Sequence, residues 1–271
     1  MTPASHTPPR VLSIAGSDSG GGAGIQADLT AFAACGVHGM TAITAITAQN
    51  TVGVTAIQPV TPEMILAQVR AVSQDIGVDA VKIGMLGNVE TIEAVARALD
   101  ELPEGTPVVL DPVMVSESGA QLLDPSARAA LIETLLPRAT VVTPNLPEAR
   151  ALTELETDDT EITETETAEL ARAVHALGPA AVVVTGGHRA QATDIFFDGS
   201  DVIEIPGERH PSGAAHGSGC THSSVLAARL ARGDTPLQAA REAKRRASEA
   251  VRQGLQEVGA GAGPVDILGV T

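Results

Sequence analysis

The sequence predicts an α/β fold in which helices cover both faces of one mostly parallel sheet. Short runs rich in Val, Ile, Ala and Thr alternate with helical patterns along the whole chain, which is typical of consecutive βαβ units. The chain has 271 residues, and its 44% hydrophobic content is enough for one large core. Neither an internal repeat nor a linker is evident, so residues 1–271 are predicted to form a single domain with a flexible segment at 1–9.

Seven apolar runs are predicted to be strands, because each is short, apolar and bounded by turn-forming or helical residues. In chain order they are VLSIA from Val11, TAITAIT from Thr41, VTAIQPV from Val54, AVKI from Ala80, PVVLD from Pro107, TVVT from Thr140 and AVVVT from Ala181. Two later runs, DIFFD and DVIEIPG, are expected to form an antiparallel pair that turns at Asp198 and Gly199.

The helices between these strands have recognisable ends. Asp124 and Pro125 are expected to begin one helix, and Gly178 is expected to end another. The last third of the chain is predicted to hold two helices, over residues 219–232 and 236–253.

Acidic residues dominate the charge of the chain. There are 33 Asp and Glu against 17 Lys and Arg, a formal net charge of -16 that would repel nucleic acid and anionic lipid. With three Phe and neither Trp nor Tyr, almost no side chain is available for bases to stack on, so nucleic-acid binding is not expected. The acidic stretch 154–169 has no apolar period at its start, and we expect an exposed loop that enters a helix at about 168–177.

The chain shows no sign of membrane insertion or export. No apolar run approaches the ~18 residues of a membrane span, and the N-terminal MTPASHTPPR lacks the apolar core of a signal peptide, so we expect a cytoplasmic protein. Cys35 and Cys220, the two cysteines, are expected to be reduced thiols. Lys82 and Lys244 are the only lysines, which together with the acidic excess resembles proteins from high-salt cytoplasms, although codon bias alone could produce it.

A glycine-rich segment follows the first strand, and ligands of such a sheet bind beyond the carboxyl ends of its strands. The segment AGSDSGGGAGIQAD, residues 15–28, has Ile25 where G-x-G-x-x-G needs its third glycine, and it lacks the Gly-Lys-Ser/Thr of a Walker loop. It is either a loop whose backbone N–H groups approach a ligand or anion, with Asp28 one helical face away, or a plain tight turn.

Polar side chains follow three other strands. Gln49 presents a donor and an acceptor side by side, which suits an amino group next to a ring nitrogen, or it only caps the strand end. Asp111 follows the fifth strand, and Asn145 and Glu148 follow the sixth; their oxygens suit a hydrated Mg²⁺. Asn145 and Glu148 could equally form a capping box at the start of a helix.

The most informative segment is AAHGSGCTHSS, residues 214–224, where a turn of small residues leads into an apolar helix. Gly217, Ser218 and Gly219 would free backbone N–H groups at the positive end of that helix, which is an anion hole suited to a transferring phosphoryl group. Cys220, in the first turn, is expected to be shifted toward thiolate and could accept a proton. His216 and His222 lie beside Cys220, but a zinc site is disfavoured, because no Cys or His beyond these is nearby in sequence.

Seven short sequence segments, taken together, form a pattern of defined order and spacing. They are AGSDSGGGAGIQADL, TAITAQNTVGV, KIGML, LDPVMV, TPNLPEA, GGH and HGSGCTHSS. With them the chain, from about Val11 to Pro264, resembles hydroxymethylpyrimidine/phosphomethylpyrimidine kinases of thiamine biosynthesis. The resemblance implies a ribokinase-like three-layer αβα sandwich that uses ATP and Mg²⁺ to phosphorylate 4-amino-5-hydroxymethyl-2-methylpyrimidine and then its monophosphate. Dimers are frequent among such proteins, so a homodimer is expected.

The resemblance also implies roles for individual residues. The acceptor pyrimidine and its phosphate would contact Gly16, Asp28, Gln49, Met85 and Val113. The nucleotide would contact Asn145, Glu148, Thr185 and Gly187. The metal would be held by Asp111 and Glu148. The anion hole and the catalytic position would be formed by Gly217, Ser218, Gly219 and Cys220, with Cys220 where sugar kinases of this fold have Asp.

Two departures from the family's usual pattern leave alternatives open. Thr185 stands where a lysine that could touch the ATP phosphates is usual, and Arg189 could compensate for it. Ser218 replaces a usual Thr and keeps the hydroxyl. One alternative is a pyridoxal or pyridoxine kinase, since that substrate is also a small ring with a hydroxymethyl arm. The other is a non-catalytic pyrimidine sensor, supported only by the missing lysine.

Overall fold

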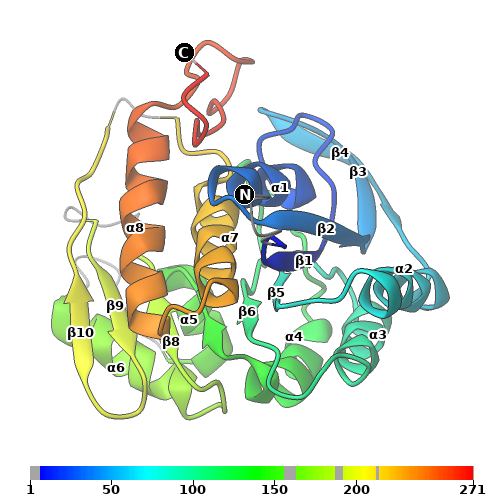
Figure 1. The fold of residues 1–271 in the computed structure, drawn as a ribbon. Helices are drawn as coiled ribbons and strands as arrows, with labels where there is room; N and C mark the ends of the chain where they lie inside the picture. Colours follow the sequence, from blue (N-terminus) through cyan, green and yellow to red (C-terminus); the bar gives the residue numbers. More distant parts are fainter. Residues whose placement is uncertain (1–6, 156–162, 187–191, 212–213, 271) are drawn as a thin grey trace, which may run out of the picture.

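The computed structural model describes residues 7–155, 163–186, 192–211 and 214–270, and its centre is a sheet with helices on both sides (Figure 1). The strands of this sheet are β1 (Arg10–Ala15), β2 (His38–Ile43), β5 (Ala80–Ile83), β6 (Val108–Leu110), β7 (Val141–Val142), β8 (Val182–Val184), β9 (Asp194–Phe197) and β10 (Val202–Ile205). Within the described residues they lie in the order β10-β9-β8-β7-β6-β5-β1-β2. Neighbours from β2 to β8 are parallel, whereas β9 is antiparallel to both β8 and β10. The predicted α/β architecture with a mostly parallel sheet is confirmed.

The helices form a layer on each face of the sheet. One layer contains α1 (Gly24–Ala34), α7 (Ser218–Ala231) and α8 (Pro236–Arg252). The other contains α2 (Pro62–Asp75), α3 (Val89–Leu99), α4 (Ala127–Ala130) with the π and 3-10 turns that continue it to Arg138, α5 (Leu146–Thr153) and α6 (Glu164–His175). The two helices predicted in the last third are confirmed to within one residue at each end.

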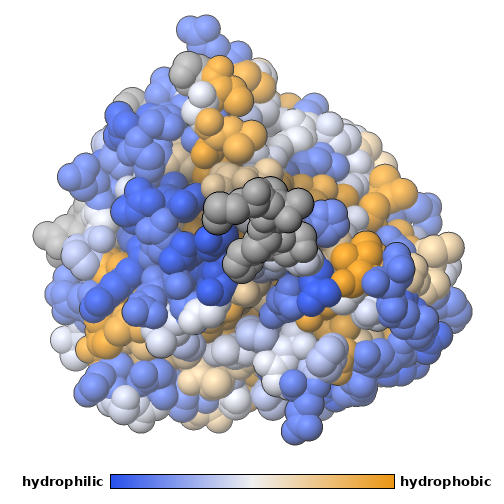
Figure 2. Space-filling model, viewed as in Figure 1, coloured by the Kyte–Doolittle hydropathy of each residue, from blue (hydrophilic) through white to orange (hydrophobic). Residues whose placement is uncertain are grey.

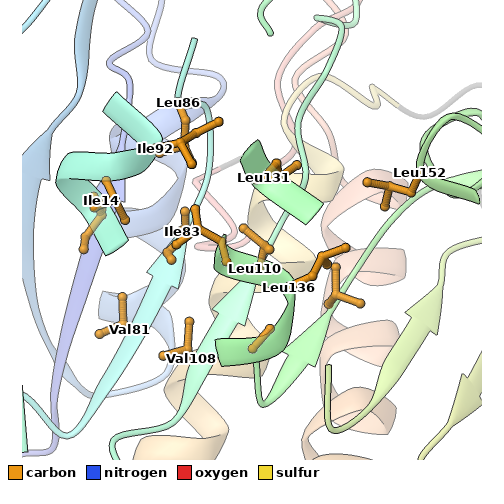
Figure 3. Packing of buried hydrophobic residues seen from close by; sticks show 14 of the residues in the cluster. Ile14, Val81, Ile83, Leu86, Ile92, Val108, Leu110, Leu131, Leu136 and Leu152 are labelled. Carbon is orange, nitrogen blue, oxygen red and sulfur yellow. The ribbon is translucent and has the colours of Figure 1, made fainter. Parts of the chain in front are cut away.

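Alternating strand residues supply the two cores. On β6, Val109 packs into the core under α1, α7 and α8, while Val108 and Leu110 pack into the core on the opposite face. Figure 3 shows the second core, in which Leu110 lies among Ile83 and Leu131, all nearly inaccessible to solvent. Burial on both faces explains why these strands are continuous apolar runs in the sequence.

One predicted strand is two strands in different sheets, which corrects the sequence prediction. The run from Thr41 bends at Thr44, where the amide donates to the Ala15 carbonyl (3.0 Å) and the hydroxyl donates to the Met85 carbonyl (2.7 Å). The chain beyond it forms β3 (Ala45–Asn50), which pairs antiparallel only with β4 (Gly53–Pro59) among the described residues. This two-stranded flap stands apart from the main sheet (Figure 1).

Three smaller expectations differ from the structure. The helix expected at Asp124 begins at Ala127, because the Asp124 amide is used by the Gly87 carbonyl (2.8 Å). The helix after the acidic stretch begins earlier than expected, since Thr163 caps it at Glu164. In the expected flexible segment 1–9, residues 1–6 lie outside the described residues and the Pro9 carbonyl accepts a hydrogen bond from His38 (2.7 Å).

The antiparallel pair β9 and β10 is confirmed, with its turn at residues 198–201.

Among the described helices, none is both long and apolar enough to cross a membrane.

Candidate active site

A cavity of about 450 Å³ opens beyond the carboxyl ends of the parallel strands. Ala15 ends β1, Asp111 follows β6, Asn145 follows β7 and Thr185 follows β8, and all four line the cavity. The parallel sheet therefore brings side chains from four distant parts of the chain to one place, as expected for an open α/β sheet.

Two helices point uncapped N-termini at this cavity. Among the described helices of eight or more residues, α2, α3, α5, α6 and α8 begin with a side chain that accepts a hydrogen bond from the first turn. The N-cap residues of α1 and α7, Ala23 and Gly217, provide no such acceptor. Both helix starts line the cavity. The Ile25 amide of α1 and the Ser218 amide of α7 already donate to the carbonyls of Gly16 and Ala215, and the amides of the first turns that do not donate within the protein are available to an anion.

Asp18 ties the glycine-rich loop to the segment before α7. Its carboxylate accepts from the amides of Gly20 (2.8 Å), Gly22 (3.1 Å) and Ala23 (2.9 Å), and its Oδ2 lies 3.0 Å from His216 Nε2. Burial alone would raise the pKa of Asp18, but His216 and the loop amides hold it below its ordinary value. The two loops that bound the cavity therefore behave as one unit.

Gly217 is where these loops touch. Its φ is 81°, and a Cβ there would lie 1.8 Å from the Gly22 carbonyl oxygen. Only glycine tolerates both the left-handed conformation and this approach. The predicted anion-hole residues Gly217, Ser218 and Gly219 thus lie at the start of α7 and line the cavity beside Cys220.

Four of the five residues predicted to contact the acceptor line one end of the cavity: Gly16, Gln49, Met85 and Val113. Met85 packs with Ala45, Leu122 and Val113 in a small apolar cluster. The Gln49 side-chain oxygen accepts from the Thr47 hydroxyl at 3.3 Å. This end therefore offers an apolar wall and one amide side chain.

Asp28, the fifth of these residues, is not in the cavity wall. It is fully buried beneath the floor, where it accepts from Lys82 Nζ (2.8 Å), Ser13 Oγ (2.6 Å) and Ser224 Oγ (2.7 Å). Its expected contact with the acceptor is therefore wrong, because three internal donors already occupy its carboxylate. Lys82 lines the cavity in its place.

Lys82 is a site residue that the sequence analysis missed. Burial works to lower its pKa, but the charges of Asp28 and Asp111 and the hydrogen bond to Asp28 raise the pKa above its ordinary value, so the ammonium stays charged. The signal in the sequence was a lysine inside the otherwise apolar strand AVKI, since a fully buried lysine requires a charged partner.

The expected shift of Cys220 toward thiolate is wrong for the unliganded protein. Burial of the sulfur raises the pKa of Cys220 to about 12, and the carboxylates of Asp111 and Asp28 add to the increase. Lys82 and the backbone amide of Gly24 act in the opposite direction but do not compensate. The thiol is therefore protonated in the free site.

Asn145 and Glu148 form the capping box that begins α5. Asn145 Oδ1 accepts from the Glu148 amide and Glu148 Oε2 accepts from the Asn145 amide, both at 2.9 Å. Both residues also line the cavity with Asp111, so the capping and binding interpretations do not exclude each other. Burial and the nearby charge of Asp111 raise the pKa of Glu148 to about 8. Burial raises the pKa of Asp111 as well, against the opposing effects of Lys82 and Ser223.

The part of the cavity where the nucleotide is predicted to bind contains predicted and unpredicted residues. Thr185 lines the cavity, whereas Gly187 and the possible compensating Arg189 lie outside the described residues. Asp194, His222 and Lys244 also line the cavity and were not predicted. A signal was present for Lys244, since the chain has only two lysines and both belong to this cavity.

The chain is similar over nearly its whole length to one protein family. A family model described as phosphomethylpyrimidine kinase matches residues 18–266. A hydroxymethylpyrimidine/phosphomethylpyrimidine kinase of Rhizobium meliloti is 50% identical over 259 residues, 94% of this chain and 95% of the relative. The protein of the same name from Bacillus subtilis is 42% identical over 260 residues, 95% of this chain and 94% of the relative.

Two solved structures of similar proteins carry different names. The ADP complex of Bacillus subtilis pyridoxal kinase superimposes with a TM-score of 0.86 at 38% identity, over 96% of this chain and 97% of that chain. Phosphomethylpyrimidine kinase from Clostridium difficile superimposes with a TM-score of 0.78 at 39% identity, over 89% of this chain and 99% of that chain. The ribokinase-like fold and the kinase class are thus common to all of these relatives.

Proposed function

The chain belongs to the phosphomethylpyrimidine kinase family, and from this membership we propose that it uses ATP to phosphorylate 4-amino-5-hydroxymethyl-2-methylpyrimidine and then the resulting monophosphate. The product would be the pyrimidine half of thiamine. The observation that supports this most directly is the cavity itself, whose wall combines the uncapped start of α7 and Cys220 with the apolar cluster around Met85 and with the charged side chains of Asp111 and Glu148.

In the first reaction the hydroxyl oxygen of the pyrimidine attacks the γ-phosphorus of ATP. The bond from that phosphorus to the bridging oxygen breaks, ADP leaves, and the hydroxyl proton passes to a base. The transition state is loose, so positioning and charge stabilisation matter most and the base acts late. The N–H groups of Gly217 and Gly219 are proposed to bind the transferring phosphoryl oxygens, whereas the Ser218 amide already donates to the Ala215 carbonyl (3.0 Å) and Ser218 would contribute its hydroxyl.

Cys220 is proposed as the base of the first reaction. Because its thiol is protonated in the free protein, it has to ionise before it can accept the substrate proton. Lys82 and the amide of Gly24 are the neighbours that favour the thiolate. In this proposal the buried ion pair of Lys82 and Asp28 fixes the positive charge under the reacting atoms.

Asp111 and Glu148 are proposed to hold Mg²⁺, directly or through its waters. Their carboxylates are close enough for the charge of Asp111 to raise the pKa of Glu148, and a divalent cation would remove that repulsion. The residues present therefore fit the ion. Bound there, Mg²⁺ would neutralise charge on the β- and γ-phosphate oxygens.

A pyridoxal kinase is the second candidate, because the Bacillus subtilis and Staphylococcus aureus structures that resemble this chain are pyridoxal kinases. The deciding experiment measures ADP release from MgATP with hydroxymethylpyrimidine, its monophosphate and pyridoxal as separate acceptors. Turnover with the first two, and much less with pyridoxal, supports the thiamine-pathway kinase. A preference for pyridoxal assigns the protein to vitamin B6 metabolism, and ligand-induced stabilisation without any turnover indicates a sensor.

We also propose a cytoplasmic homodimer that associates through the β3–β4 flap. Ile46, Val52 and Ile57 of the flap are 55%, 59% and 41% exposed, and apolar surface gathers over this region in Figure 2. One edge of this flap is also unpaired among the described residues. Sedimentation of the wild type and of Ile57→Asp tests it: the substitution should convert a dimer to a monomer, and a monomeric wild type contradicts the proposal.

A further inference from the structure

A buried charged cluster lines the same cavity as Cys220 and the anion hole, near Thr185, where the nucleotide is predicted to bind. Asp194 at the start of β9 is its centre, with Lys244 of α8 and His222 of α7 on either side. The Lys244 Nζ is 2.6 Å from Asp194 Oδ1, and His222 Nε2 is 3.3 Å from Asp194 Oδ2. Asp194 and His222 are only 1% and 4% exposed, and all three residues line the cavity.

The hydrogen bonding of this cluster is incomplete. The Asp194 Oδ1 accepts from both Lys244 and the Gly186 amide (2.9 Å). Among the described residues, His222 Nδ1 is buried without a hydrogen-bond partner, and the 3.3 Å contact between His222 Nε2 and Asp194 Oδ2 lacks hydrogen-bond geometry. Unsatisfied buried polar groups are costly, so their presence in a cavity wall indicates a ligand that completes them.

The position of the cluster in the cavity wall indicates which part of a nucleotide it would contact. On α8, the turn after Lys244 presents Ala247, Ser248 and Val251 to the cavity, a small and mostly apolar surface that suits a base. On α7, His222 lies one turn after Ser218, which belongs to the anion hole. The cavity wall thus combines an apolar surface, the cluster of Lys244, Asp194 and His222, and the anion hole, a set of groups that suits the base and the phosphate chain of one nucleotide.

We infer that Lys244 is the cation that recognises the phosphate chain of the nucleotide, and that Asp194 is a positioning residue that holds the ammonium toward it. This inference rests on the proposed ATP-dependent function. An ammonium has three N–H donors and one is given to Asp194, so two are left for phosphate oxygens. The side chain at Thr185, which ends the neighbouring strand, is uncharged and cannot take this role.

Binding of ADP and of adenosine to the full-length protein separates phosphate recognition from base recognition. Lys244→Met should weaken ADP binding about ten- to hundredfold, the usual effect of losing a charge-assisted contact, and should leave adenosine binding within about twofold. In turnover, the KM for ATP should rise while the KM for the pyrimidine stays within about twofold. Arg241→Met removes an exposed cation three residues earlier on the same helix and should change neither ligand.

Lys244→Met leaves the Asp194 carboxylate without its ammonium, which could unfold the protein. The double variant Lys244→Met/Asp194→Asn removes both charges, and its melting temperature should recover while its ADP binding stays weak. Normal ADP affinity in either folded variant, or an equal loss for adenosine, overturns the inference. If the wild type itself binds no ADP, the proposed function fails instead.

Discussion

At the scale of single residues, Cys220 separates the two phosphorylation steps. The first acceptor is an alcohol that must lose a proton, whereas the second is a phosphate already ionised near pH 7. Cys220→Ala should therefore slow the first reaction at least about tenfold more than the second, within the usual contribution of a general base. Single-turnover rates with each acceptor measure this. Cys35→Ala, which removes the other cysteine thiol, should alter neither step.

The protonated thiol also predicts the pH dependence of the first step. Below a pKa of about 12 the thiolate fraction rises about tenfold per pH unit, so the ratio of first-step to second-step kcat/KM should increase from pH 7 to 9. In this ratio, the pH effects of groups that act equally in both reactions, such as Glu148, cancel. A flat ratio, or equal losses in Cys220→Ala, would leave Cys220 as a structural part of the anion hole.

Glu148 predicts how stability depends on pH. Its pKa rises from 4.5 to about 8 on folding, so the folded protein binds the extra proton between these values. The stability that the protonated Glu148 gives the folded protein is fully present below about pH 4.5 and is lost as pH rises through about 8. The effect of Glu148→Gln on the free energy of unfolding of the apo protein should therefore depend on pH. We expect this effect to be more stabilising at pH 8.5 than at pH 5, by a few kcal/mol. Urea denaturation at the two pH values measures the change.

Glu166 is the matched control, because it occupies the same capping-box position on α6 but faces solvent. Hydrogen bonds from Thr163 lower the pKa of Glu166, so its contribution is present above pH 4.5 and is lost as pH falls. Glu166→Gln should therefore change the pH dependence only on the acid side. An identical response of the two variants contradicts the assignment to Glu148.

Asp28 shows what a residue-level interpretation of the sequence could not resolve. Asp28 is three residues after Ile25, so the two lie on the same, buried face of α1. The helical period alone is therefore enough to place Asp28 toward the interior, although the prediction of an acceptor contact did not use it. The sequence could not show that the interior partner was Lys82, because that pairing depends on the neighbouring positions of β1 and β5 and on the packing of α1 beneath them.

At the scale of elements, the start of α7 depends on Gly217. Gly217→Ala would place a methyl group against the Gly22 carbonyl in a left-handed backbone, which costs about 1–2 kcal/mol before any clash. We expect a melting temperature several degrees lower and a large loss of turnover, because the two loops must separate. Gly219→Ala is the control for stability, since among the described residues no atom outside its chain neighbours and its own helix backbone lies within 4 Å of its Cβ position. Equal destabilisation by both substitutions would contradict this.

The element boundaries that the sequence missed depend on tertiary contacts. TAITAIT has uniform β propensity, and only the hydrogen bonds of Thr44 to Ala15 and Met85 divide it into β2 and β3. By contrast, α8 was predicted closely because its cap, Thr235 with Gln238, is local in sequence. The turn of small residues at the start of α7 was located for the same reason, since Gly217, Ser218 and Gly219 are contiguous. The cluster at Lys244 was missed because it joins residues from three elements.

At the scale of the whole molecule, the distribution of cations bears on the high-salt hypothesis. The formal net charge is -16, and both lysines are buried in the cavity wall, at 0% and 8% exposed. The described surface therefore has no lysine. A codon bias toward Arg would lower the number of lysines, but it would not by itself explain why the two that remain are both internal. Dense surface carboxylates repel one another unless salt screens them or hydrated cations bind among them.

Raising KCl separates these two effects. Screening alone should raise the melting temperature mainly up to about 0.15 M, where the Debye length has fallen to about 8 Å. We expect the increase, and the turnover with hydroxymethylpyrimidine, to continue rising into about 1 M KCl, because small cations then share hydration water with the carboxylates. Choline chloride at equal ionic strength screens equally but cannot coordinate carboxylates, so its effect should level off early. Identical curves in the two salts would mean that the acidic surface only needs screening.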